Sequence, residues 1–438
     1  MNYRMVMLPL LALGVLALVS APLSLITSAP ALAVSCEDCG GGGAGGGGGT
    51  SGGGGASGGS GNLFEWNTVL GSGQWSLTDV TGATGFATSA SIRAVPFLDP
   101  NGNLDVFAAN PSGQLLLFSR PLGGGFYQVQ NLSAAVGGMT IVSEPSPIHY
   151  GNGVQVFALG GDGNEQAWVQ SQPGAAWQVF PVSNSQPLAG NPQAITDGTN
   201  VHVYAYRSDN HHLMELFKPQ TTGWQLFDLS ATVSGVDGVN PTPYLYGGNS
   251  VQTLAINDAT HHLWAYVELF AGPSQGVSSF DLTALAGAPA PIDNPKPALF
   301  PEGGTTVEVF GPGHNSGDQF DKNLVNYQKI PTSNWQYFDT SNNSIPQSGI
   351  INQGIPAPIV DGNDIHVFGH AHFDLGCQGF NCTNVFDTVV DWFKTPSVAN
   401  WQAIDIGQAV GRHFASLSDP GSMFVDSTST IEVFATGS

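Results

Sequence analysis

The segment Asp105-Val106-Phe107-Ala108 decides the fold, because six further copies of its pattern return along the chain. Each copy is a β-branched or aromatic pair followed by a small residue. The others are Gln155-Val156-Phe157-Ala158, His202-Val203-Tyr204-Ala205, Gln252-Thr253-Leu254-Ala255, Glu308-Val309-Phe310-Gly311, His366-Val367-Phe368-Gly369 and Glu432-Val433-Phe434-Ala435. A period of roughly 50 residues indicates repeated supersecondary units that share a core.

The residues around each copy predict the rest of the unit. Prolines precede most copies, and a polar turn and a second apolar segment follow. An aromatic residue with an acid four positions later then ends the unit, as in Trp224 to Asp228, Trp335 to Asp339 and Trp401 to Asp405. Four short strands per unit is the pattern of a β-propeller blade.

The two ends of the repeat region predict how the ring closes. The last unit stops at Phe434 to Ser438, after its second strand. Two strands that would complete it stand at the other end, at Leu63 to Trp66 and at Trp75 to Asp79. Pairing of these ends would leave no free sheet edge. We therefore expect an all-β, seven-bladed β-propeller over residues 62–438, closed by its N-terminal outer strands pairing with its C-terminal inner strands.

Residues 1–33 have the features of a signal peptide. Arg4 gives a positive start, Met5 to Ile26 is almost entirely apolar, and Ala31-Leu32-Ala33 is a small-residue cleavage signal. The apolar stretch is also long enough for an uncleaved membrane anchor. Residues 34–61 are a Cys-containing, Gly-rich segment that predicts a flexible linker. The chain is thus expected to be secreted or held at the cell surface.

The four cysteines fit an exported protein. Cys377 and Cys382 are near neighbours and are expected to form a disulfide. Cys36 has two interpretations: a bond to Cys39, or a lipid anchor, because Ala33-Val34-Ser35-Cys36 resembles a bacterial lipoprotein acylation site.

The overall charge limits the partners. The chain has 438 residues and a formal charge of −22, which disfavours nucleic acids and anionic membranes. Only 10% of its residues are charged, and its 59 Gly and 29 Pro favour turns and short strands. Neutral ligands such as sugars, and cations, remain open.

The tryptophans are the first candidate ligand contacts. Those that open the outermost strands are interpreted as structural. Four others lie on third strands of their blades: Trp66, Trp168, Trp264 and Trp392. An aromatic face can bind the C–H face of a sugar. Packing between blades is the alternative.

Carboxylates beside these rings are the second candidates. Glu65, Glu215 and Asp391 share one register of the repeat, and Asn326 takes the same place in the fifth blade. A carboxylate accepts strong hydrogen bonds from sugar hydroxyls. A solvated strand face is the alternative interpretation.

Metal and catalytic motifs are weak. His366, His370, His372 and Asp374 alternate along one strand and are the better metal candidates. His211-His212 and His261-His262 recur in one turn, which a duplicated sequence also explains. No motif indicates a cofactor, a nucleophile or a glycosidase carboxylate pair, so catalytic activity is left uncertain and less favoured.

The blade pattern resembles the propeller lectins that bind fucose. The resemblance covers residues 62–438, and its best unit runs from His202 to Arg207 and on to Leu213-Met214-Glu215-Leu216 and Gly223-Trp224. In the fungal members an Arg, a Glu and an aromatic residue hold each fucose. The resemblance places Glu65 and Glu215 at the Glu position, with Asp391 as a near substitute. His202, Glu432 and His366 hold the Arg position. No blade has the complete set, which implies degenerate sites, with Arg207 as a further candidate ligand contact.

Three functional hypotheses follow. The first is a carbohydrate-binding, lectin-like propeller with glycan partners, in which the four rings are partly exposed beside the carboxylates. The second is a protein-binding or adhesive scaffold that uses the loop between Cys377 and Cys382. The third is a glycosidase or lyase, which needs two carboxylates facing one cleft near the ring axis.

Overall fold

The computed structural model describes residues 60–182, 186–233, 236–270, 276–288, 295–299, 306–314, 322–329, 334–340, 351–352, 354–361, 364–375, 384–395, 400–425 and 427–438. The chain divides into two compact units, Met1–Gly52 and Gly53–Ser438, and all described residues belong to the second. The expected signal peptide, most of the linker and all four cysteines lie outside the described residues, so those predictions stay predictions. Within the described part of the chain, no helix is long and apolar enough to cross a membrane.

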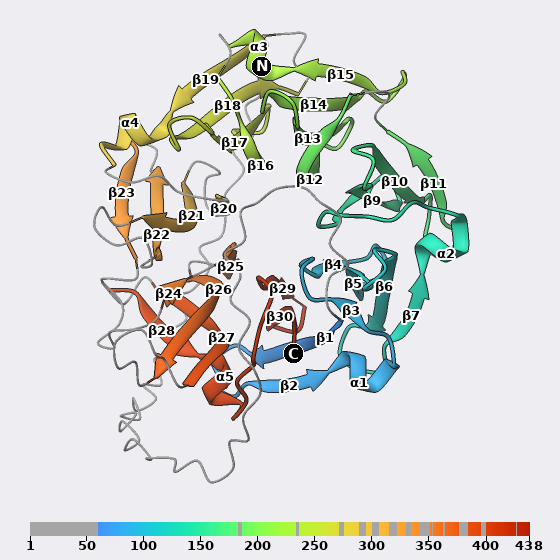
Figure 1. Cartoon of the computed structure of the whole chain (residues 1–438), viewed down its shortest axis with the longest axis vertical. Coiled ribbons are helices and arrows are strands. Elements are labelled where there is room, and N and C mark those ends of the chain that lie inside the picture. The colour runs from blue at the N-terminus through green and yellow to red at the C-terminus, as the bar shows by residue number, and fades with distance from the viewer. Residues whose placement is uncertain are drawn as a thin grey trace, which may run out of the picture. The chain divides into compact units, whose positions relative to one another are not determined.

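Seven antiparallel sheets form a ring, which confirms the predicted seven-bladed propeller (Figure 1). The strands of each blade are given from the centre of the ring outward. Blade 1 consists of β4 Val95–Leu98, β5 Asn103–Ala109, β6 Leu115–Pro121 and β7 Gln128–Asn131, and blade 2 of β8 Ser146–Tyr150, β9 Gly153–Leu159, β10 Glu165–Gln170 and β11 Gln178–Pro181. Blade 3 consists of β12 Leu188–Thr196, β13 Val201–Arg207, β14 Leu213–Lys218 and β15 Gln225–Asp228. Blades 4 and 5 consist of β16 Val239–Tyr246, β17 Ser250–Ile256, β18 Leu263–Leu269 and β19 Val277–Asp281; and β20 Lys296–Leu299, β21 Val307–His314, β22 Lys322–Lys329 and β23 Gln336–Asp339. Blade 6 consists of β25 Ala357–Asp361, β26 Asp364–Leu375, β27 Asn384–Lys394 and β28 Gln402–Asp405, with the short β24 Ile351–Asn352 also on β26.

Blade 7 combines both ends of the propeller, as the sequence predicts. Its strands are β29 Gly421–Val425 and β30 Thr430–Gly437 from the C-terminal end, and β1 Ser60–Val69 and β2 Ser76–Asp79 from the N-terminal end. β1 pairs with β30 over its length, from Asn62 opposite Gly437 to Val69 opposite Thr430. The short β3 Thr88–Ser89 pairs with the start of β1. The ring therefore closes through backbone hydrogen bonds between segments that lie far apart in the sequence.

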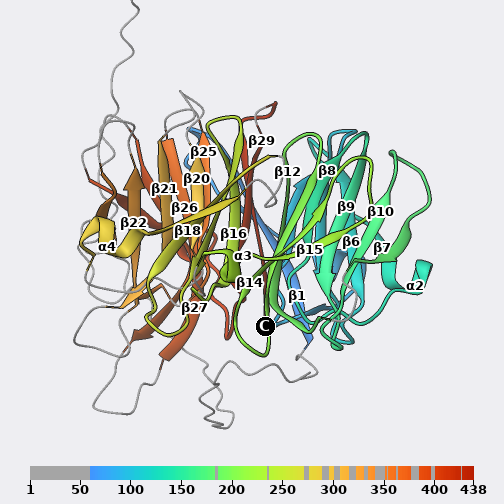
Figure 2. The same cartoon turned by 90° about the horizontal axis from the view of Figure 1, so that it is seen from above.

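The core lies between the blades. Each repeated second-strand segment, such as Val106-Phe107-Ala108, is buried. The described residues form seven buried apolar clusters, and each cluster joins two successive blades. Figure 2 shows the sheets packed side by side around the ring. Because a blade cannot bury its faces alone, the core at each junction depends on both of the blades that form it.

The outer tryptophans belong to these junctions. Trp177 contacts Phe107 of the preceding blade edge to face, with ring centroids 6.2 Å apart. Trp224 contacts Phe157 in the same way at 5.8 Å, and two more such pairs follow, Trp75 with Phe368 and Trp401 with Phe310. This confirms the structural interpretation of these outer-strand rings, because each fills space against the second strand of the blade before it.

The polar residue that ends five of the outer strands is a helix cap, an aspartate in four blades and Asn131 in blade 1. Short helices leave the outer strands: α1 Val80–Thr84, α2 Leu132–Val136, α3 Leu229–Thr232, α4 Leu282–Ala286 and α5 Ile406–Ala409. In α4 the Asp281 carboxylate accepts a 2.9 Å hydrogen bond from the Ala284 amide. The residue before each of the other four helices makes the equivalent bond. Among the residues that the structure describes, the repeat thus ends five of the seven outer strands with a capped helix, since such caps satisfy free amides at a helix start.

Candidate functional site

Neighbouring blades enclose one comparable space at each junction, here called a slot and named by its two blades. Three positions line it. The second-strand position begins each repeated segment: Asp105, Gln155, His202, Gln252, Glu308, His366 and Glu432. The third-strand position is paired with the aromatic residue of that segment or its replacement: Leu117, Ala167, Glu215, Ala265, Asn326, Asp391 and Glu65. The facing position lies three residues beyond the third-strand position of the next blade: Gln170, Lys218, Glu268, Lys329, Lys394, Thr68 and Arg120.

In the 7/1 slot these positions form a buried ion cluster. Arg120 Nη2 donates to Glu65 Oε1 at 2.5 Å and to Glu432 Oε1 at 3.1 Å. Its Nε donates to the Tyr127 hydroxyl at 3.1 Å. All three charged side chains are less than a tenth exposed. Burial, and the nearby Glu65 carboxylate, raise the pKa of Glu432 to about 8. Arg120 thus bonds glutamates from both ends of the propeller chain, and the raised pKa of Glu432 favours its protonated form at neutral pH.

The 5/6 and 6/7 slots are filled in related ways. Asn326 donates to Glu308 Oε2 at 2.6 Å, and Lys394 is the charge facing them. In the 6/7 slot, His366 Nδ1 and Asp391 Oδ2 are 2.9 Å apart. Although burial opposes it, the hydrogen bond and charge of Asp391 raise the pKa of His366. A lysine therefore accompanies the buried carboxylate in the 5/6 slot, and a histidine does so in the 6/7 slot.

The 4/5 slot is different because small side chains leave it partly empty. Ala265 stands at the third-strand position, and Leu254 replaces the repeated Phe or Tyr. A cavity of about 270 Å³ remains. Its lining includes Tyr246, Gln252, Ala265, Val267, Phe280, Leu282, Leu285, Lys329, Asn334 and Trp335.

The walls of this cavity combine aromatic surface with a few polar groups. Trp335 comes from blade 5, and Phe280 pairs with Ala265 on blade 4. Phe280 and Leu285 are about half exposed, so this side of the cavity is open to solvent. The Tyr244 hydroxyl donates to Gln252 Oε1 at 2.5 Å, which fixes the orientation of the amide. Such a mixture is typical of sites for small, partly apolar ligands with hydroxyl groups.

The 2/3 slot has much of the same composition but is better filled. Ala167, Gln155 and Lys218 occupy the positions of Ala265, Gln252 and Lys329. Phe157, however, fills the place of Leu254 and packs on Trp224. The Lys218 ammonium lies 5.5 Å from the centroid of the same Trp224 ring. The presence of a second-strand Phe therefore separates a filled slot from an open one.

The predicted pairing of tryptophan with carboxylate is wrong. Glu65 and Trp66 are adjacent on one strand, so their side chains point to opposite faces of the blade. Glu65 faces Arg120 of blade 1, whereas Trp66 packs in the cluster shared with blade 6. Asp391 and Trp392 of blade 6 are adjacent on β27 and are separated in the same way.

The predicted exposure of the four rings fails for three of them. Trp66, Trp168 and Trp392 have no exposed surface, because they pack against the preceding blade. Trp264 is half-buried and lies two residues out of register with the other three, opposite Ala255. Glu65, Glu215 and Asp391 are buried as well, so their predicted solvated alternative is also wrong.

The remaining candidates lie elsewhere. Arg207 Nη2 pairs with Asp209 in the turn after β13, away from Glu215. His370 lies 3.1 Å from Asp387, and the side chains of His372 and Asp374 are outside the described ones, so the metal prediction for β26 stays a prediction. In the histidine pairs, the second histidine contacts a helix cap: His212 with Asp228 at 2.8 Å, and His262 with Asp281 at 2.7 Å.

A second cavity of about 270 Å³ lies among the inner strands of the ring. Its charged lining residues are Arg93 and Lys296. Arg93 pairs with Glu144 at 3.0 Å. Burial and the Arg93 charge lower the pKa of Lys296 to about 8. No carboxylate is among the described residues that line this cavity, but the Asp419 and Glu144 carboxylates lie close enough to affect the pKa of Lys296.

Sequence reasoning missed Arg120, Glu268 and the 4/5 cavity. The signal was present as a spacing: the facing residue stands three positions after the third-strand position of the next blade. Because three is odd, that residue points to the opposite face and meets the preceding blade. The cavity itself is lined by Ala265, whose small side chain belongs to no motif in the sequence.

No protein-family model matches this sequence, and no curated protein matches it. Solved structures with similar folds include lectin propellers. The BP39L lectin from Burkholderia pseudomallei is 15% identical with a TM-score of 0.44, over 71% of this chain and 98% of that chain. The SapL1 lectin, solved with alpha methyl fucoside, is 14% identical with a TM-score of 0.43, over 73% and 96%. AofleA from Arthrobotrys oligospora is 13% identical with a TM-score of 0.39, over 72% and 86%. These similarities concern the fold.

Proposed function

We propose that this chain is a carbohydrate-binding propeller whose principal site is the 4/5 slot. The observation that carries the proposal is the cavity of about 270 Å³ beside Trp335. At the comparable 2/3 junction, Phe157 packs on Trp224 instead. The volume suits one sugar ring rather than a drug-sized ligand. Its ligand is a neutral glycan, because the formal charge of −22 disfavours anions.

The chemistry of the walls supports a polyhydroxyl ligand. Phe280, Tyr246 and Trp335 offer ring faces for sugar C–H groups. Gln252, Lys329 and Asn334 add groups that can bond hydroxyls. Their number is small relative to the apolar surface, as expected where polar contacts orient a ligand that apolar contacts hold.

The buried carboxylate slots have other roles in this proposal. Glu65 and Asp391 already bond Arg120 and His366. A sugar would have to break those bonds and open a packed junction, which disfavours binding there. The number of functional sites is therefore smaller than the number of blades.

A glycan-array screen of the full chain, followed by calorimetry with the selected sugar, tests the proposal. Trp335→Ala should weaken binding by at least about tenfold, because stacking alone contributes roughly 0.5–1.5 kcal/mol beyond buried area. Trp224→Ala is the matched control: it removes the corresponding ring from the filled 2/3 slot and should leave affinity at the 4/5 slot unchanged.

Ala265→Leu tests the need for the empty cavity itself, whereas Trp335→Ala removes one of the side chains that line it. The chain already has Leu117 at this position in blade 1, where it is buried. The variant should fold and fill the cavity, so binding should fall while the midpoint of urea unfolding is retained. Unchanged affinity in both Trp335→Ala and Ala265→Leu would exclude the 4/5 slot. A blank array with folded protein would favour the alternative of a protein-binding scaffold.

Secretion is part of the proposal. Its support is the pattern of residues 1–33, with Arg4 before the apolar segment and Ala31-Leu32-Ala33 after it. A secreted or surface-held lectin meets glycans outside the cell. The mass of the exported protein decides between cleavage at Ala33, lipidation at Cys36 and an uncleaved anchor.

A further inference from the structure

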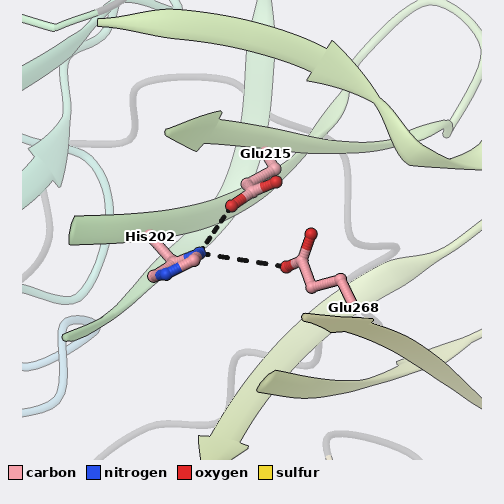
Figure 3. Close-up of side chains that lie close together, drawn as sticks. All are labelled: His202, Glu215 and Glu268. Carbon is pink, nitrogen blue, oxygen red and sulfur yellow. Dashed lines mark hydrogen bonds and ion pairs between the residues drawn. The ribbon is translucent and has the colours of Figure 1, made fainter. Parts of the chain in front are cut away.

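The 3/4 slot contains a cluster of three buried residues that face one another. His202 is on β13, Glu215 on the neighbouring β14, and Glu268 on β18 of the next blade (Figure 3). His202 Nδ1 lies 2.7 Å from Glu215 Oε1 and 4.0 Å from Glu268 Oε1. One nitrogen and two carboxylate oxygens all lie within 4.8 Å of one another. None of the three side chains is more than 3% exposed.

The cluster lacks the cation that the equivalent 7/1 cluster has. Glu268 stands at the facing position, where Arg120 stands in the 7/1 slot and Lys394 in the 5/6 slot. Among the described residues, no Lys or Arg forms an ion pair with Glu215 or Glu268. The second oxygen of each glutamate, Oε2, is buried without a hydrogen-bond partner. A buried carboxylate pair of this kind is costly unless a positive charge compensates it.

The distances are close to those that a bound metal ion requires. Zinc bonds of roughly 2.0–2.2 Å at tetrahedral angles place ligand atoms about 3.3–3.5 Å apart. His202 Nδ1 would move away from Glu215 by less than about 1 Å and approach Glu268 by a similar amount. Imidazole together with carboxylates favours Zn²⁺ over Ca²⁺ or Mg²⁺, which prefer oxygen ligands alone.

Surrounding groups orient the ligands. His202 Nε2 lies 3.4 Å from Asp197 Oδ2. A carboxylate on the far nitrogen holds the Nε2–H tautomer, which leaves the Nδ1 lone pair directed at the two glutamates. The Tyr204 hydroxyl donates to Glu268 Oε1 and holds that carboxylate in place. The Tyr204 and His202 rings are stacked in parallel, with their centroids 6.5 Å apart.

We propose that His202, Glu215 and Glu268 form a structural site for a divalent metal ion of the Zn²⁺ class, which joins blade 3 to blade 4. The ion takes the place that the Arg120 guanidinium has between blades 7 and 1. Because the site is closed to solvent, the ion enters during folding and is retained. The site is separate from the proposed sugar cavity, which lies on the opposite side of blade 4.

Metal content of the refolded full chain tests this site. Wild-type protein is unfolded in urea, refolded with Zn²⁺ or with EDTA, freed of unbound metal by gel filtration and analysed by mass spectrometry for zinc. Wild type should retain one Zn²⁺ more per chain than Glu268→Gln, which keeps the side-chain shape and removes a ligand. Glu308→Gln is the matched control, because it changes a buried glutamate in the 5/6 slot and should retain the same zinc as wild type.

Glu268→Arg is a second test of the same site, for the case in which the zinc content of Glu268→Gln gives no clear answer. This variant copies the 7/1 arrangement, so it should fold without Zn²⁺ and show the same thermal midpoint with Zn²⁺ and with EDTA. Wild type should have a higher midpoint after refolding with Zn²⁺ than with EDTA. Equal zinc content in wild type and Glu268→Gln, or no zinc in either, would overturn the proposal and leave protons as the compensating charge.

Discussion

The 7/1 and 4/5 slots have one backbone geometry and opposite contents. In the 7/1 slot Glu65, Glu432 and Arg120 form a buried ion cluster. In the 4/5 slot Ala265 and Gln252 leave a cavity beside Trp335. The repeat thus supplies a space at each junction, and the residues at three positions decide whether it stabilises the ring or remains open for a ligand.

The ion cluster of the 7/1 slot lies at the point where the two ends of the propeller close the ring. Glu65 is on the N-terminal strand β1 and Glu432 on the C-terminal strand β30, which pair to close the ring. Arg120 bonds both, so blade 1 adds a charged contact at the closure. The open slot lies at a junction of two blades that are each continuous in sequence.

The largest predicted effect is a loss of unfolding free energy when the ion cluster of the 7/1 slot is broken. Arg120→Met leaves Glu65 and Glu432 buried without their cation, and breaking such a cluster costs roughly 3–5 kcal/mol of unfolding free energy. Urea unfolding of the full chain measures it. Arg207→Met, which removes a solvent-exposed pair with Asp209, should leave the urea-unfolding midpoint nearly unchanged. Equal losses in the two variants would mean that the 7/1 cluster does not hold the ring closed.

The pH dependence of stability tests other buried carboxylates in the slots. Burial raises the pKa of Asp105 to about 7 and that of Glu308 to about 7. Their protons are held more tightly in the folded state than in the unfolded state. Their contribution is therefore fully present below about pH 4 and is lost as the pH rises through about 7. Unfolding free energy should fall by at least about 1 kcal/mol over this range.

Asp105→Asn is the control for this pH dependence. The amide cannot ionise, so the variant should lose part of the decline between pH 4 and pH 8. A wild-type protein that gains stability over this range, or a variant with an unchanged profile, would contradict the burial of an ionisable group at this position.

A smaller effect on stability and sugar binding is expected from a change in the helix that lines the 4/5 slot. Asp281 caps α4, which contributes Leu282 and Leu285 to the cavity. Asp281→Ala should cost about 1 kcal/mol of stability and weaken sugar binding through a less ordered wall. Asp281→Asn keeps a capping oxygen and should retain most of both properties. Calorimetry and urea unfolding of the two variants separate the cap from the charge.

The smallest change in stability is expected from Leu254→Phe. The variant restores the repeated aromatic residue and should pack on Trp335 as Phe157 packs on Trp224. Stability should change by less than about 1 kcal/mol, since the ring fills existing space. Sugar binding should nevertheless be lost. Retained binding would show that the absence of a second-strand ring is not what makes the slot functional.

The fold was predictable because it depends on repetition. The segment ending in Val106-Phe107-Ala108 and its copies fix the second strand of each blade, and the unpaired ends at Leu63 and Phe434 fix the closure. The site was less predictable for a geometric reason. Glu65 and Trp66 are neighbours in sequence, but strand alternation directs them to different junctions. Arg120 and Glu65 are distant in sequence, yet they meet.

Some features of the site depend on volumes rather than motifs. Ala265 belongs to no motif in the sequence, and only the structure shows that it lines the cavity and lies opposite Leu254 on β17. The similarity of the 2/3 slot shows how little is needed to close such a space, since one Phe separates the two. The recurring aspartate at the end of the outer strands, as at Asp228 and Asp405, was visible as a repeat, but its role as a helix cap needed the structure.

A crystal structure of the full chain with the sugar selected on the array tests the central claim most directly. The account predicts electron density for one sugar ring in the 4/5 slot, in contact with Trp335 and Phe280, while Glu65 and Arg120 keep their bond in the 7/1 slot. A sugar bound in the 7/1 slot or in the cavity of Arg93 and Lys296, with the 4/5 slot empty, would contradict it.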